Sequence, residues 1–171
     1  REMFGDDVAP AGALVIKAVR SPFPRAAVQF GDLDRFVTAT PGLRMVLKAA
    51  DVPGKNAFGV IPAFQDQPVF AEIETRFRGE AVAAVIGTAA TMSRFDVSDF
   101  PVVWTELPAV SEVAEALHPD AVQLHAAHPE NVMCGGFVAH GDALAGLTAA
   151  DVVVEGAFET GFVEHGYIEP E

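Results

Sequence analysis

The chain has 171 residues, of which 50% are hydrophobic, which suits one domain, or one domain and part of another, with a substantial core. Its 24 acidic and 11 basic residues give a formal net charge of -13, which repels phosphate backbones and anionic membrane surfaces, so we expect no nucleic-acid and no membrane partner. The single cysteine, Cys134, excludes an internal disulfide and an all-cysteine metal or iron–sulfur site within the chain, and the N-terminus has no signal-peptide pattern, so a cytoplasmic location is expected and a periplasmic one stays open.

Apolar and β-branched runs separated by proline and glycine predict three short strands in the first part of the chain. These strands cover residues 14–19, 26–30 and 45–47. The second strand is predicted to pair with the first. Asp32 is expected to cap a helix that contains Leu33, Phe36 and Val37 at helical spacing. Residues 55–67 show no period and predict a long loop, of a kind that is often functional.

Residues 78–110 are predicted to hold the centre of the fold. The run 81–87 is apolar throughout and predicts a strand buried on both faces. A small amphipathic helix is expected within residues 88–99, and residues 100–107 predict another strand. Strand, helix and strand in this order indicate a βαβ unit. Trp104 and the phenylalanines are assigned to the core.

Two helices and a strand are predicted in the last third. Ser111 is expected to cap a helix over residues 112–117, and Asp142 a helix over residues 143–150. Alternating apolar side chains predict a strand over residues 151–160. Several strands with few, short helices indicate an α+β domain and not a doubly wound sheet.

The C-terminal residues 160–171 are apolar and aromatic almost to the end and lack a solvated tail. Such an end is expected of a shortened chain or of a subunit whose end another chain holds, and we favour the first.

Motifs that would indicate common catalytic sites are absent from the sequence. There is no glycine-rich nucleotide motif, no GxSxG, no HExxH and no CxxC. Three histidines, His118, His125 and His128, could ligate a metal ion if their segment were helical. Pro119 and Pro129 break any helix there, so we expect these side chains to be solvated and expect no metal site.

The densest charged group lies near the C-terminus. On a strand, His165, Tyr167, Glu169 and Glu171 would share one face, where a histidine beside carboxylates could bind a cation or a proton. A structural hydrogen-bond network is the favoured interpretation, because buried polar groups are paired far more often than they are catalytic. Cys134 has no cation nearby in sequence and is expected to be an inert small hydrophobic residue and not a reactive thiol.

Five motifs then stand in order along the chain. They are GALVIKAVRSPFPRAAV, AADVPG, QDQPVFA, RGEAVAAVIGTAATMSRFDVSDFPVVWTELPAV and HGDALAGLTAADVVVEGAFETGFVEHGYIEPE. Together they resemble the molybdenum hydroxylases, which are enzymes of the xanthine dehydrogenase and aldehyde oxidase type. The resemblance implies an α/β hammerhead domain, with a mixed sheet and a few short helices, over residues 1–150. Residues 151–171 would then be the first strand or two of the following molybdopterin-binding domain.

The resemblance also implies a function for the complete enzyme. Molybdenum bound to molybdopterin would insert a water-derived hydroxyl into an aldehyde or an aza-aromatic compound such as a purine, and electrons would leave through iron–sulfur clusters, often to FAD. The implied partners are the remainder of the large subunit, an iron–sulfur subunit or domain and often a flavin subunit. The family's pterin-binding loops and catalytic glutamate lie beyond Glu171, so we expect no catalytic residue, metal ligand or cofactor in this chain alone, and no activity when it is isolated.

Certain residues match the family pattern and others depart from it. Its EHxYxEPE motif falls on residues 164–171, where His165, Tyr167 and Glu169 are expected to face the cofactor-bearing domain without taking part in catalysis. Phe23 and Arg25 replace typical histidines, and the pair at residues 104–105 replaces a typical tyrosine and glutamate, so no particular substrate is inferred. The function expected is a non-catalytic scaffold fragment; the alternatives are a stand-alone binding module and a small metal-dependent enzyme that uses the histidines.

Overall fold

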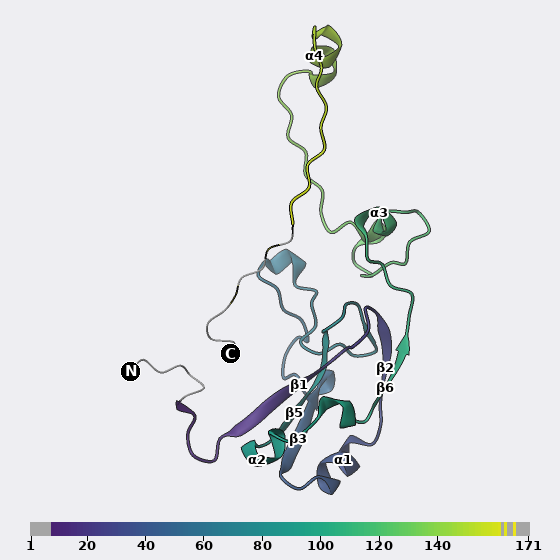
Figure 1. Ribbon diagram of the computed structural model, residues 1–171. Coiled ribbons are helices and arrows are strands. Elements are labelled where there is room, and N and C mark those ends of the chain that lie inside the picture. Colours follow the sequence, from purple (N-terminus) through teal and green to yellow (C-terminus); the bar gives the residue numbers. More distant parts are fainter. Residues whose placement is uncertain (1–7, 162, 164–165, 167–171) are drawn as a thin grey trace. The chain divides into compact units, whose positions relative to one another are not determined.

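The computed structural model describes residues 8–161, 163 and 166 (Figure 1). The chain divides into two units, of which the larger comprises residues 9–131 and the smaller contains the described residues after 131 together with Val8. The α+β class is confirmed, because the larger unit contains two small sheets and few helices. None of the helices in the described ranges has the length and apolar character needed to cross a bilayer.

The larger unit is built from six strands, three short helices and several 3-10 turns. The strands are β1 (Leu14–Arg20), β2 (Ala26–Phe30), β3 (Leu43–Lys48), β4 (Glu74–Thr75), β5 (Ala81–Thr88) and β6 (Val102–Glu106). The helices are α1 (Leu33–Ala39), α2 (Ala89–Met92) and α3 (Val113–Ala116). The 3-10 turns are Ala49–Asp51, Pro62–Phe64, Val97–Asp99 and Pro129–Asn131.

The strands form two three-stranded sheets, with the orders β1-β5-β3 and β4-β2-β6, and every described pair is antiparallel. The predicted pairing of residues 26–30 with residues 14–19 is therefore wrong, and so are the mixed sheet and the βαβ unit. The chain changes sheets after β1, where the N–H of Ser21 donates to the carbonyl of Glu80 and the N–H of Gly79 donates to that of Ser21. These two hydrogen bonds end the β1–β5 ladder, and the residues that follow form β2 in the second sheet.

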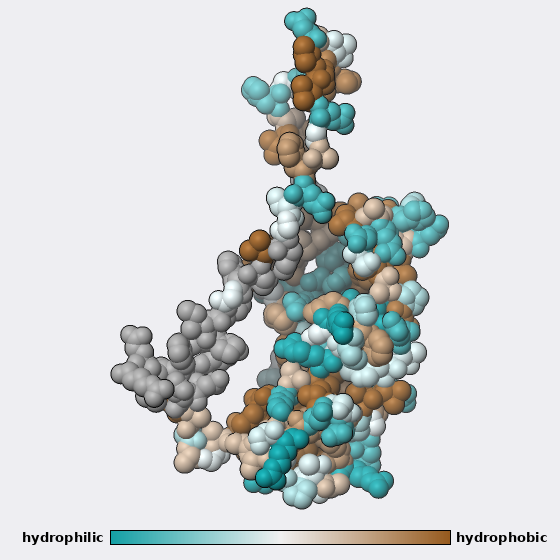
Figure 2. Space-filling view, viewed as in Figure 1, coloured by the Kyte–Doolittle hydropathy of each residue, from teal (hydrophilic) through white to brown (hydrophobic). Residues whose placement is uncertain are grey.

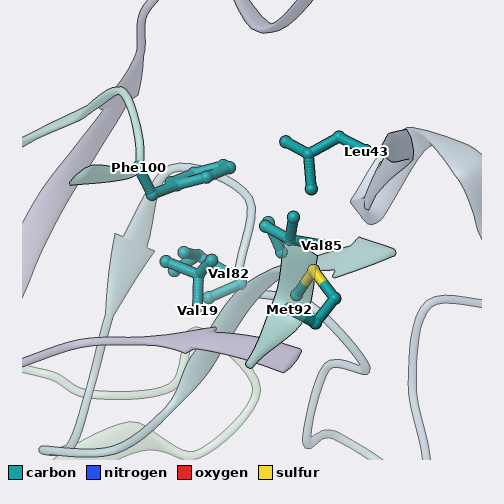
Figure 3. Close-up of a cluster of buried hydrophobic side chains, with 8 residues drawn as sticks. Val19, Leu43, Val82, Val85, Met92 and Phe100 are labelled. Carbon is teal, nitrogen blue, oxygen red and sulfur yellow. The ribbon is translucent and has the colours of Figure 1, made fainter. Parts of the chain in front are cut away.

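The central strand β5 is buried, as the sequence predicts: Val82, Ala83 and Val85 are each 0% exposed. Figure 3 shows Val82 and Val85 beside other buried side chains from β1, β3, α2 and the loop before β6. Those neighbours are Val19, Leu43, Met92 and Phe100. Trp104 and the phenylalanines at positions 30, 36 and 95 pack around this cluster, whereas those at 58, 77, 137 and 158 are exposed, so the assignment of all phenylalanines to the core is wrong.

The helix caps were predicted correctly at two of three positions. Asp32 caps α1 by accepting a hydrogen bond from the N–H of Arg35, and Asp142 caps α4 (Ala143–Ala149) by accepting one from Ala145. Ser111 does not cap α3, because the N-cap position is Glu112 and the N–H of Ser111 instead donates to the carboxylate of Glu115.

The helix predicted within residues 88–99 is interrupted. It ends as α2 at Met92, and the carboxylate of Asp96 accepts from the N–H of Ser98 to begin a separate 3-10 turn. Phe95 lies between the two and still packs against the core.

The smaller unit contains α4 between two extended stretches (Figure 1). The alternation of residues 151–160 predicts a strand, but the structure assigns none there, which makes this prediction wrong for the chain by itself. A strand needs a neighbouring ladder, and no described strand pairs with these residues.

Candidate functional site

Three ionisable side chains from two distant loops meet within the larger unit. Asp66 lies in the loop between β3 and β4, and His125 and His128 lie in the loop after α3. The Oδ2 atom of Asp66 is 3.1 Å from Nδ1 of His125 and 3.1 Å from Nε2 of His128. The two histidine side chains are only 34% and 17% exposed, respectively. We call Asp66, His125 and His128 the Asp66–histidine cluster.

The surroundings of the cluster favour a neutral His125. Burial lowers the pKa of this imidazole below its usual 6.5, and the Arg76 cation and His128 lower it further, whereas Asp66 and Glu80 raise it. A neutral imidazole can still donate one N–H to a carboxylate. In the cluster His128 makes this hydrogen bond to Asp66, whereas Nδ1 of His125 lies 3.1 Å from the same carboxylate oxygen.

The arrangement suits a structural contact. Among the residues that the structure describes, no three His, Cys, Asp or Glu side chains are arranged to hold a metal ion. The ring of His128 packs beside Phe64, with centroids 6.4 Å apart, and thus adds an apolar contact to the polar one. The cluster joins the loop before β4 to the loop that leads out of the larger unit.

A second polar centre organises the same outgoing loop. The side chain of Asn131 accepts a hydrogen bond from the N–H of Leu124 and donates to the carbonyls of Ala116 and Val122. Its φ of 57° lies in the left-handed region, which asparagine tolerates better than most residues. Asn131 carries no signal in the sequence, because its three partners are seven to fifteen positions earlier and form no local motif.

The prediction that the loop histidines are solvated is correct for His118 and wrong for the cluster. The side chain of His118 is 64% exposed, whereas His125 and His128 are partly buried against Asp66. The prolines do prevent a regular helix, as expected. They do not prevent a contact with a carboxylate 62 positions away in the sequence, and no local pattern could have shown it.

The contact between the two loops that the Asp66–histidine cluster joins is expected to weaken at acid pH. Because the pKa of His125 is lowered in the folded state, its contribution to stability is present above about pH 6.5 and is lost as the pH falls through the lowered pKa. We expect the amides of Leu124, His128 and Asn131, which are hydrogen-bonded within this loop, to lose several-fold of their hydrogen-exchange protection between about pH 7.5 and about pH 5.

Protection factors corrected for the intrinsic exchange rate test this expectation. The His125→Gln variant should lose the pH-dependent step, whereas His118→Gln, at the exposed position, should keep it. An equal step in all three proteins would show that His125 does not control the loop.

The smaller unit offers a different kind of surface. Every described residue from 133 to 161 is exposed, and many of them are apolar. The most exposed large hydrophobic side chains within residues 133–161 are Phe137 (90%), Val138 (99%), Val154 (89%) and Phe158 (97%). Figure 2 shows hydrophobic residues on the surface of this segment. A contiguous exposed apolar segment of this kind is typical of an interaction surface.

The remaining predicted residues are placed as follows. Cys134 is exposed, and the inertness of its thiol stays a prediction. His165, Tyr167 and Glu169 lie outside the described residues.

Arg25, at a position of departure from the family pattern, bridges the second sheet: its guanidinium is 2.9 Å from the carboxylate of Glu74 and donates to the carbonyl of Pro108.

Comparison with protein families identifies one model. The model described as "Aldehyde oxidase and xanthine dehydrogenase, a/b hammerhead domain" matches residues 1–108, which is more than half of the chain. A probable xanthine dehydrogenase subunit from Bacillus subtilis is 31% identical over 165 residues, covering 96% of this chain and 22% of that protein. The nicotinate dehydrogenase large molybdopterin subunit of Eubacterium barkeri is 27% identical, covering 98% of this chain and 38% of that protein.

Solved structures agree with this match. The aldehyde oxidoreductase of Desulfovibrio gigas superposes with a TM-score of 0.64 at 26% identity, covering 74% of this chain and 15% of that one. The CO dehydrogenase of Oligotropha carboxidovorans superposes with a TM-score of 0.60 at 26% identity, covering 70% of this chain and 15% of that one. The chain thus spans 22% and 38% of the length of the two relatives and a smaller share of the structures.

Proposed function

The chain belongs to the aldehyde oxidase and xanthine dehydrogenase family, of which it carries the a/b hammerhead domain, and from this premise we propose that it is a non-catalytic scaffold of a molybdenum hydroxylase. It would form the first part of the molybdopterin-binding large subunit of an oxidoreductase that hydroxylates aldehydes or aza-aromatic compounds. Its role would be to present surfaces to the rest of that subunit and to the iron–sulfur partner. A flavin subunit would be a further partner, which accepts the electrons from the iron–sulfur clusters.

The exposed segment 133–161 carries this proposal. Fully burying a large apolar side chain such as Phe158 stabilises a protein by about 1.5–3 kcal/mol. A segment with several exposed side chains of this kind is therefore strongly stabilised when another surface covers it. This chain covers only 22% and 38% of the length of the two relatives, so in a subunit of such length the remaining residues would be available to supply that surface. On this proposal residues 1–150 are the hammerhead domain and residues 151–171 begin the next domain.

The unpaired stretch 151–160 supports that domain boundary. Its apolar alternation is the pattern of a strand that is half buried in a sheet, yet no described strand of this chain pairs with it. We propose that the following domain supplies the missing ladder. His165, Tyr167 and Glu169 would then pack against the cofactor-bearing part.

We propose that the molybdenum cofactor is held by the remainder of the subunit and not by this chain. No three His, Cys, Asp or Glu side chains of the described residues are arranged for a metal ion, and Asp66 already contacts both cluster histidines. The cofactor would supply the redox chemistry from elsewhere in the complete subunit. This chain would contribute to the shape of that subunit and to the positioning of its parts.

Metal analysis of the native complex tests the proposal. The assembly that contains this chain should carry molybdenum and iron and should hydroxylate its substrate, and removal of residues 9–131 from the large subunit should abolish turnover. If the chain elutes alone and free of both metals, it is a stand-alone binding module. Normal turnover by the shortened large subunit would also contradict the scaffold role.

A further inference from the structure

The sheet formed by β1, β5 and β3 has a face that does not contribute to the core. Val19 and Val85 alternate to the core side of their strands and belong to the buried cluster of Figure 3. The neighbouring positions point the other way. The register places Ile16 and Met45 on either side of Ile86, in one row across the three strands.

A second row of the same face follows two positions along. Ala18 and Leu47 are the partners of Ala84 on either side of β5. We call these six residues the outer face: Ile16, Ala18, Met45, Leu47, Ala84 and Ile86. It contains no polar and no charged side chain.

The outer face is exposed at one residue of each outer strand, whereas Ala18 and Leu47 are partly buried. Ile16 is 63% exposed and Met45 is 46% exposed, whereas Ile86 between them is 8% exposed and lies outside the core cluster. Figure 2 shows hydrophobic residues along the edge of the larger unit where Figure 1 draws β1. An antiparallel sheet that faces water on one side normally alternates apolar with polar residues. The positions in these two rows are apolar instead, which is the pattern of a sheet covered on both faces.

We propose that the outer face is covered in the complete enzyme by the part of the large-subunit polypeptide that lies outside this chain. This inference rests on the proposed function and assigns one of its surfaces. This chain covers 22% and 38% of the length of the two relatives, so more than half of such a subunit lies outside it. Interfaces without central charges resemble a domain core and are characteristic of permanent contacts.

A second copy of the same chain fits this face less well. Each copy carries a formal charge of -13, and two such chains repel each other at long range. A segment of the same polypeptide meets the face at high effective concentration. The covering element is therefore expected to be apolar and to belong to the same subunit.

Methionine oxidation tests this assignment with an internal reference. Met45 is 46% exposed in this chain, and Met92 is 1% exposed. Dilute hydrogen peroxide should oxidise Met45 readily in the 171-residue chain and Met92 slowly, since access of the oxidant controls the reaction. In the full-length large subunit, purified without its partner subunits, we expect oxidation of Met45 to slow by about tenfold towards the rate of Met92. Peptide mass spectrometry measures both rates in one digest.

Each other outcome contradicts the assignment in a distinct way. An unchanged rate for Met45 in the full-length subunit would show that the face stays open. Slowing only after the iron–sulfur subunit is added would make that subunit the occupant. Slowing in the short chain as its concentration rises would indicate a second copy.

Molybdenum content of the same full-length sample separates this inference from the function on which it rests. Bound molybdenum with an accessible Met45 would overturn the surface assignment alone. A protected Met45 in a subunit that acquires no molybdenum from its native host would overturn the hydroxylase function alone.

Discussion

Substitution of Val85 by aspartate is expected to unfold the chain, whereas substitution of Ile16 by aspartate is expected to leave it folded. Val85 is 0% exposed in the central strand and belongs to the core cluster, so its replacement buries an unpaired carboxylate at a cost of several kcal/mol. Domains of this size have a total stability of about 5–15 kcal/mol, and the lost packing adds to the loss. Ile16 is on the neighbouring strand but is 63% exposed, so its carboxylate stays in water.

Urea unfolding followed by far-ultraviolet circular dichroism separates the two variants. The Val85→Asp chain should lack a folded baseline, and Ile16→Asp should change the free energy of unfolding by less than about 1 kcal/mol. A milder variant, Met92→Ala, should remain folded and lose about 2–5 kcal/mol, because it leaves a cavity at a residue that is 1% exposed. A folded Val85→Asp chain with normal stability would mean that β5 is not the centre of the core.

Local patterns in the sequence were sufficient to predict the elements whose formation depends on a few neighbouring residues. The run at residues 81–87 has no polar side chain, and the structure buries it as β5. Asp32 and Asp142 each precede an apolar periodic segment, and each accepts the N–H three residues later. In these cases the cause is confined to a few neighbouring residues, so one sequence is enough.

Contacts between distant residues could not be predicted in the same way. β2 pairs with β4 and β6, because the hydrogen bonds around Ser21 redirect the chain, and nothing in the sequence of β2 specifies that choice. Arg25 meets a carboxylate 49 positions later, and the histidines of the Asp66–histidine cluster meet one about 60 positions earlier. The resemblance to a known family supplied the fold where the local pattern did not, but it could not supply these side-chain pairs.

Substitution of Phe158 by aspartate is expected to leave the stability of the isolated chain nearly unchanged and to impair the assembly of the full-length enzyme. Phe158 is 97% exposed, so the isolated chain should change its free energy of unfolding by no more than about 0.5 kcal/mol. In the full-length subunit the same position would be covered. There the variant loses about 1.5–3 kcal/mol of apolar burial and adds the cost of burying a carboxylate.

The expected consequence is a large subunit that assembles poorly. A loss of about 3 kcal/mol or more corresponds to at least about a hundredfold change in an equilibrium constant, so the molybdenum content per purified subunit should fall by at least about tenfold. The neighbouring Glu159→Gln and the conservative Phe158→Leu serve as matched controls, and both should retain molybdenum close to the unsubstituted level, because neither places a new charge on the apolar side. Full molybdenum content in Phe158→Asp would show that this segment remains in water in the enzyme, and the scaffold role would then have to rest on surfaces of the larger unit.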